Sequence, residues 1–108
     1  MTSARRRLQN RRHSTSFEIE HCGLRYSISY SLFDDGTLAE CFINNHKRNG
    51  AADIAARDAG ILLSFCLQFG CDAATISRAL SRNSDGSASG VVAAALDKIL
   101  AEEVHSCG

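Results

Sequence analysis

The sequence lacks several features that would assign it to a protein class at once. Its 108 residues include no proline, no tryptophan and a single methionine. No apolar run approaches the roughly 20 residues that cross a bilayer, and the N-terminus has no apolar core of a signal peptide. We therefore expect a cytoplasmic protein without a membrane segment, folded as one domain.

The cysteines lack the spacing of a metal or redox site. Five are present, and no two of them form a C-x-x-C pair, whereas zinc ligands and redox dithiols come in such pairs. We expect free, reduced thiols, no metal and no cofactor. The spacing of serine, histidine and acidic residues also indicates no catalytic pairing, so we expect no enzyme.

The net charge is zero, but the charge is unevenly distributed. Residues 1–16 carry five arginines and no acidic residue, and the rest of the chain has 7 Lys or Arg against 12 Asp or Glu. Such a polar segment cannot bury enough surface to offset its ordering entropy, so we predict a disordered basic arm. Two interpretations stay open, a solubilising tail and an arm that contacts DNA phosphates. The arginines are Arg5, Arg6, Arg7, Arg11 and Arg12.

Alternating apolar and polar residues predict three strands, at residues 17–22, 24–32 and 38–44. Gly36, in an Asp-Asp-Gly-Thr run, supplies the positive φ of a hairpin turn between the second and third strands. Consecutive strands joined by short turns predict an antiparallel meander.

Three helices are predicted to follow, at residues 51–69, 73–81 and 91–104. Gly70 is a typical helix stop and Asp72 a typical N-cap. The first helix carries an apolar stripe that we expect to face the core, and residues 105–108 are predicted to fray. The stripe consists of Ile54, Ile61, Leu62, Phe65 and Phe69.

These elements predict an α+β fold, a three-stranded antiparallel β-meander packed against three helices (βββααα), as a single two-layer domain over residues 17–104. The predicted core comprises Phe17, Ile19, Tyr26, Ile28, Tyr30, Phe42, Ile54, Leu62, Phe65, Phe69, Ile76, Leu80, Leu96 and Ile99.

A basic loop precedes the first helix and is a candidate anion site. Helix N-termini present free N–H groups that suit phosphate or nucleotide. Asp53 in the first turn would repel an anion, so a solvated polar turn is the alternative. The candidate ligand residues are Asn45, His46, Lys47, Arg48 and Gly50.

Residues 63–82 resemble a helix-turn-helix, which places its second helix in the DNA major groove. Its reading face would comprise Ser77, Arg78, Ser81 and Arg82. Any helix corner in a compact domain needs similar packing residues, and the acidic balance outside the arm argues against DNA.

One stretch resembles a known family. Glu40-Cys-Phe-Ile-Asn44, the Lys/Gly-containing loop, and a long helix ending Leu67-Gln-Phe-Gly70 are similar to the small C-terminal TSCPD-type domain of coenzyme-B12-dependent ribonucleotide reductases. The resemblance covers roughly residues 24–80. The family's TSCPD motif and cysteine-rich end are absent here.

The resemblance implies an appended domain without the catalytic barrel, the cobalamin site or the radical cysteine. We therefore expect a non-catalytic accessory or regulatory module that binds a protein partner or a nucleotide. The alternative is a DNA-binding regulator that uses the arm and the helix corner. A homodimer through an open sheet edge is a further option.

Overall fold

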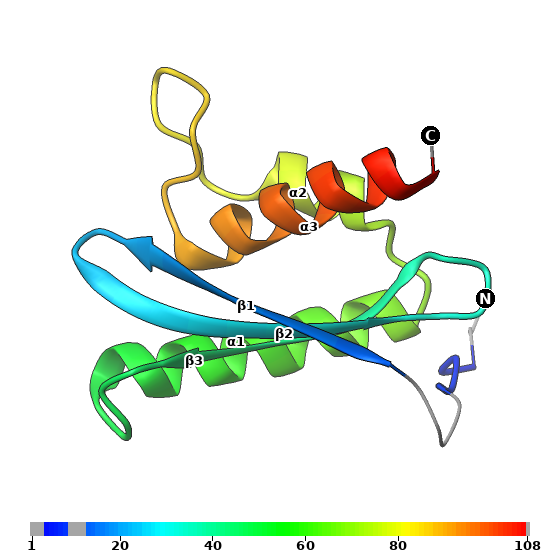
Figure 1. The fold of residues 1–108 in the computed structure, drawn as a ribbon, viewed down its shortest axis with the longest axis horizontal. Helices are drawn as coiled ribbons and strands as arrows, with labels where there is room; N and C mark the ends of the chain where they lie inside the picture. Colours follow the sequence, from blue (N-terminus) through cyan, green and yellow to red (C-terminus); the bar gives the residue numbers. More distant parts are fainter. Residues whose placement is uncertain (1–3, 9–12, 108) are drawn as a thin grey trace.

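The computed structural model describes residues 4–8 and 13–107, and it confirms the predicted order of elements (Figure 1). The strands pair in the order β1-β2-β3, and both pairs are antiparallel, as a meander requires. The elements are β1 (Ser14–His21), β2 (Leu24–Leu32), β3 (Leu38–Asn45), α1 (Ala51–Gln68), α2 (Ala73–Ala79) and α3 (Val91–Cys107).

Three boundaries differ from the sequence prediction by two residues or more. β1 begins at Ser14, inside the predicted arm, because Ser14 still pairs with Ser31 of the long strand β2. α2 ends at Ala79, two residues early. α3 continues to Cys107, so the backbone of residues 105–107 is helical where we predicted fraying. Residues 1–3, 9–12 and 108 lie outside the described residues.

The hydrophobic core lies on one face of the sheet, beneath α2 and α3 (Figure 1). Ile28 pairs with Ile43 across the β2–β3 ladder, and both are fully buried together with Leu96 and Ile99 of α3. The alternation of β1 and β2 therefore places their apolar side chains as predicted. On β3, Ile43 is buried in place of the predicted Phe42, because Ile43 pairs with Ile28 and Phe42 pairs with Ser29 on the other face. Tyr26, Ile28, Tyr30, Leu96 and Ile99 are buried, and Phe17, Ile19, Ile76 and Leu80 are half-buried against them.

α1 runs along the outer edge of β3 and satisfies its backbone with polar side chains. Asp53 Oδ1 accepts from the N–H of Asn45 at 3.0 Å, and Gln68 Nε2 donates to the carbonyl of Ala39 at 3.1 Å. Between them, Ser64 Oγ accepts from the N–H of Cys41 at 2.9 Å. A helix therefore closes this edge in place of a fourth strand.

This packing corrects the predicted core of α1. The buried residues of the helix include Asp53, Gly60, Ser64 and Gln68, because a backbone edge requires small and hydrogen-bonding partners. The apolar stripe faces away from the sheet. Its members Ile54, Leu62, Phe65 and Phe69, together with Phe42 on β3, are exposed where burial was predicted.

Candidate functional site

The predicted anion loop forms one wall of a polar pocket of about 540 Å³. Asn45, His46 and Arg48 line it, together with Glu18 and Ser27 from the neighbouring strands. Lys47 and Gly50 do not line it. The structure thus brings three of the five predicted ligand residues together.

A carboxylate of the chain itself occupies the position expected for an anion. Asp53 accepts from the N–H of Asn49 at 2.9 Å and from the N–H of Asn45 at 3.0 Å. These two bonds, with Arg57 Nε at 3.3 Å, hold the pKa of Asp53 below its ordinary value despite desolvation. With Glu18 in the wall as well, two acids offset Arg48 and Arg57, so the pocket has little net positive charge to attract phosphate.

His46 does not complete a nucleophilic set. Its Nε2 lies 2.9 Å from Ser27 Oγ and 3.7 Å from Glu18 Oε2. In a serine–histidine–carboxylate relay the hydroxyl and the carboxylate contact different ring nitrogens. Here both contact the same nitrogen, so the geometry does not activate Ser27.

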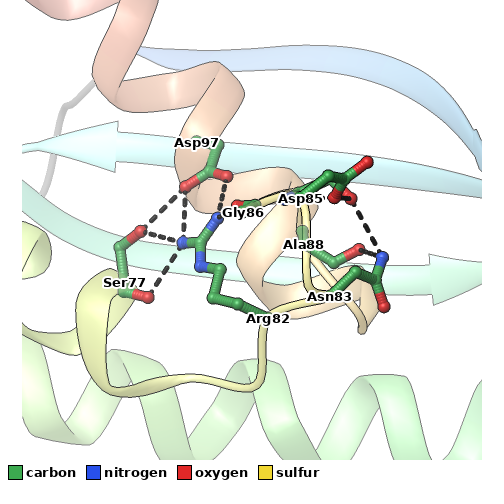
Figure 2. Close-up of polar contacts among 8 residues, drawn as sticks. Ser77, Arg82, Asn83, Asp85, Gly86, Ala88 and Asp97 are labelled. Atoms are coloured by element: carbon green, nitrogen blue, oxygen red, sulfur yellow. Dashed lines mark hydrogen bonds and ion pairs between the residues drawn. The ribbon is translucent and has the colours of Figure 1, made fainter.

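The helix corner proposed for DNA reading carries a polar network that joins α2 to α3 (Figure 2). Arg82 lies beyond the end of α2, and its Nη2 donates to Asp97 Oδ1 at 2.9 Å and to the carbonyl of Ser77 at 2.9 Å. Ser77 Oγ also donates to Asp97, at 2.8 Å. Of the predicted reading face, Ser77 is buried and Arg82 is half-buried in this network, whereas Arg78 and Ser81 are exposed.

The described part of the basic arm lies across the C-terminal end of α1. The N–H of Arg6 donates to the carbonyl of Gln68 at 2.7 Å, and its guanidinium lies 3.9 Å from the centre of the Phe33 ring. Arg5 Nε donates to Gln68 Oε1 at 2.6 Å, and its guanidinium lies 4.5 Å from the centre of the Phe65 ring. Arg7 is exposed, and Arg11 and Arg12 lie outside the described residues.

The arm also borders a second, more apolar cavity of about 570 Å³. Arg6, the β2–β3 turn, the α1–α2 connection and the end of α3 form its walls. Arg6 Nη2 forms an ion pair with Asp35 Oδ2 at 3.1 Å beside this cavity. This ion pair ties the arm to the turn that the sequence predicted.

The side of α1 that faces away from the sheet exposes large apolar side chains. We define the outer face of α1 as Ile54, Ile61, Leu62, Phe65 and Phe69, whose exposed fractions run from 41% to 65%. α1 lies at the outside of the molecule (Figure 1). Phe42, 39% exposed, lies beside this helix on β3.

The comparison with family models identifies the domain. A model described as the TSCPD domain matches residues 2–104. The chain belongs to the TSCPD domain family. The match to this TSCPD domain includes β1 and most of α3, beyond residues 24–80, which carry the sequence resemblance. No curated protein and no solved structure matches it.

Two features are absent from the described part of this TSCPD domain. No helix within it is long and apolar enough to span a membrane. No group of three histidine, cysteine, aspartate or glutamate side chains within it is placed to hold a metal ion.

Sequence reasoning missed the outer face because it assigned the apolar stripe to the core. A second stripe gives the signal that would have found it. Asp53, Gly60, Ser64 and Gln68 recur at helical spacing, and this small and polar stripe suits a backbone edge. When both stripes occupy one helix, the apolar one is left outside.

Proposed function

We propose that this TSCPD domain is a non-catalytic accessory or regulatory module that acts by association with protein through the outer face of α1. The observation that carries the proposal is the exposure of five large apolar side chains on one helix face. Monomeric proteins rarely expose large contiguous apolar patches without a binding role.

The family supports the same role. TSCPD domains are small parts of B12-dependent ribonucleotide reductases, and the TSCPD family model matches residues 2–104 of the chain. The polar pocket at His46 offers no activated nucleophile, and the Arg82 network serves packing. Association through a surface is the activity that the remaining features favour.

The test compares two helix-surface variants in the cells that make the protein. Leu62→Arg places a charge on the outer face of α1, and Ala101→Arg places one on the exposed surface of α3. After cross-linking, the proteins that are enriched with the tagged wild-type domain are identified, and they include any untagged copies of the domain itself. These proteins should be lost with Leu62→Arg and retained with Ala101→Arg. Equal enrichment with both variants would refute the proposal, provided that both melt like the wild type.

A second candidate, binding of a phosphate or nucleotide, rests on the polar pocket that contains His46 and Arg48, although Glu18 and Asp53 offset its positive charge. A ligand that binds only the folded state raises its melting temperature. Nucleoside phosphates should then stabilise the wild type but not a Lys47→Ala/Arg48→Ala variant. Stabilisation of both proteins alike would place the ligand elsewhere.

DNA binding has weaker support. α2 has only 7 residues, and Arg82 is engaged by Asp97. A short duplex should therefore bind, if at all, through the arm, with an affinity that falls steeply as salt rises.

A further inference from the structure

We infer that the protein that covers the outer face of α1 is a second copy of this chain, packed with the two α1 helices antiparallel and centred between Ile61 and Leu62. This inference rests on the proposed function and names the partner of the same surface. The hypothesis explains why an apolar helix face lies outside and why one acidic residue stands within it.

The outer face is symmetric about its centre. Ile54 and Phe69 lie at equal distances along the helix on either side of the midpoint between Ile61 and Leu62. In an antiparallel pair related by a twofold axis, Ile54 therefore meets Phe69 of the second copy, and Ile61 meets Leu62 of the second copy. A self-complementary surface of this kind is what an isologous dimer requires.

Charge complementarity supports the same alignment. Asp58 lies in the outer face, one helical turn from both Ile54 and Leu62. It is exposed, and no hydrogen bond or ion pair joins it to another described residue. The antiparallel alignment places Asp58 opposite Phe65 of the second copy.

A positive charge beside the ring of Phe65 fits this position. The guanidinium of Arg5 lies 4.5 Å from the ring centre and is fixed there by Gln68. Asp58 is about 10 Å along the helix from Phe65 of its own chain, at 1.5 Å per residue. Asp58 therefore reaches the Arg5 of the second copy, and the twofold axis creates two such ion pairs.

The available area is sufficient for a dimer of modest affinity. Five outer-face side chains and Phe42 are 39% to 65% exposed. At about 100 Å² of exposed area for each large side chain, two copies would bury roughly 1,200 Å², the lower limit for specific interfaces. The net charge of zero gives two copies no overall repulsion.

The experiment uses charge reversal on the full-length protein, measured by analytical ultracentrifugation over a range of concentrations. The wild type should form dimers. Asp58→Lys and Arg5→Glu should each weaken dimerisation by about tenfold or more, because each places two pairs of like charges at the interface.

Mixing the two single variants gives the decisive result. In the mixed dimer, the lysine introduced by Asp58→Lys in one chain faces the glutamate introduced by Arg5→Glu in the other. The remaining pair is the unchanged Arg5 with the unchanged Asp58, so dimers should return to near wild-type affinity. Failure of the mixture to dimerise would overturn the antiparallel arrangement. A wild type that stays monomeric at every concentration would overturn the inference altogether.

These outcomes are distinct from failure of the proposed function. If the pure protein is monomeric but Leu62→Arg still removes a different protein from the enriched set, the second copy is the wrong partner and the function stands. If Leu62→Arg changes neither dimerisation nor enrichment, both proposals fail.

Discussion

Ser64 of α1 binds both backbone groups that Cys41 of β3 directs outward. Its hydroxyl oxygen accepts a hydrogen bond from the N–H of Cys41 at 2.9 Å. The hydroxyl hydrogen has two possible acceptors, the carbonyl oxygen of Cys41 at 3.0 Å and the carbonyl oxygen of Gly60 at 2.9 Å. One side chain thus makes hydrogen bonds that a further strand would make at this edge, and this explains why Ser64 is buried.

Ser64→Ala should lower the free energy of unfolding by about 1–3 kcal/mol, the usual cost of leaving a buried donor without a partner. Urea denaturation with an unchanged m-value provides the measurement. Ser81→Ala, at an exposed serine, is the matched control and should cost little. Equal losses for the two variants would show that the edge contact does not contribute to stability.

Gly60→Val should destabilise the fold through steric conflict with β3. A Cβ at this position would lie 3.1 Å from the carbonyl oxygen of Cys41 and 3.2 Å from the nitrogen of Ile43, both rigid backbone atoms. Overpacking of this kind costs about 1–3 kcal/mol. Ala55→Val, on the exposed side of the same helix, should cost only about 0.5 kcal/mol from helix propensity. If the two variants melt together, α1 has room to move away from the edge.

The sequence predicts the buried face of a strand more reliably than the buried face of α1. Alternation placed Ile28 in the core correctly, because β2 has one apolar and one polar face. β3 carries apolar residues on both faces, and there Ile43 is buried where Phe42 was predicted. α1 carries two stripes with helical period, and which of them is buried depends on what it packs against. A sheet face would select Leu62 and Phe65, whereas a backbone edge selects Ser64 and Gln68.

The candidate sites were predictable only in part, for a related reason. Sequence proximity brought Asn45, His46 and Arg48 to one pocket, as expected for a short loop. The partner of Arg82 is Asp97, which lies 15 residues away on another helix. No local pattern indicates such a contact, so the sequence alone predicts Arg82 for a DNA-reading face and does not reveal its pairing with Asp97.

The pairing of Asp97 with Arg82 should make stability depend on pH. The hydrogen bond from Arg82 is the main cause that holds the pKa of Asp97 below its ordinary value. Desolvation acts in the opposite direction, and the hydrogen bond from Ser77 lowers the pKa by a smaller amount. A carboxyl whose pKa is lower in the folded state stabilises the fold above about pH 4 and loses this contribution as pH falls through the folded-state pKa.

Asp97→Asn should therefore be less stable than the wild type near pH 7, and the difference should shrink below about pH 4. Urea denaturation at about pH 7, 5 and 3 measures it. Arg82→Gln should flatten the pH profile in the same way, since it removes the other partner. A difference between wild type and Asp97→Asn that stays constant across this pH range would contradict the ion-pair interpretation.

The cysteines should differ sharply in reactivity. Cys22, Cys66 and Cys71 are free and exposed, whereas Cys41 is buried, and burial raises the pKa of its thiol to about 12. In a Cys107→Ser background, a thiol reagent at about pH 8 should modify three groups quickly and the fourth only as the protein opens, because the thiolate is the reactive form. Four equally fast groups would show that Cys41 is accessible.

The slow thiol also reports on the edge contact. Cys41 belongs to the buried core cluster, so its thiol becomes reactive only when the fold opens. Ser64→Ala should accelerate its modification by about the factor by which it raises the population of the open state. A loss of about 1.4 kcal/mol corresponds to a tenfold change. Ser81→Ala should leave the rate unchanged. Modification of Cys41 at the wild-type rate in Ser64→Ala, despite lower global stability, would mean that the thiol is exposed by a motion that leaves α1 in place.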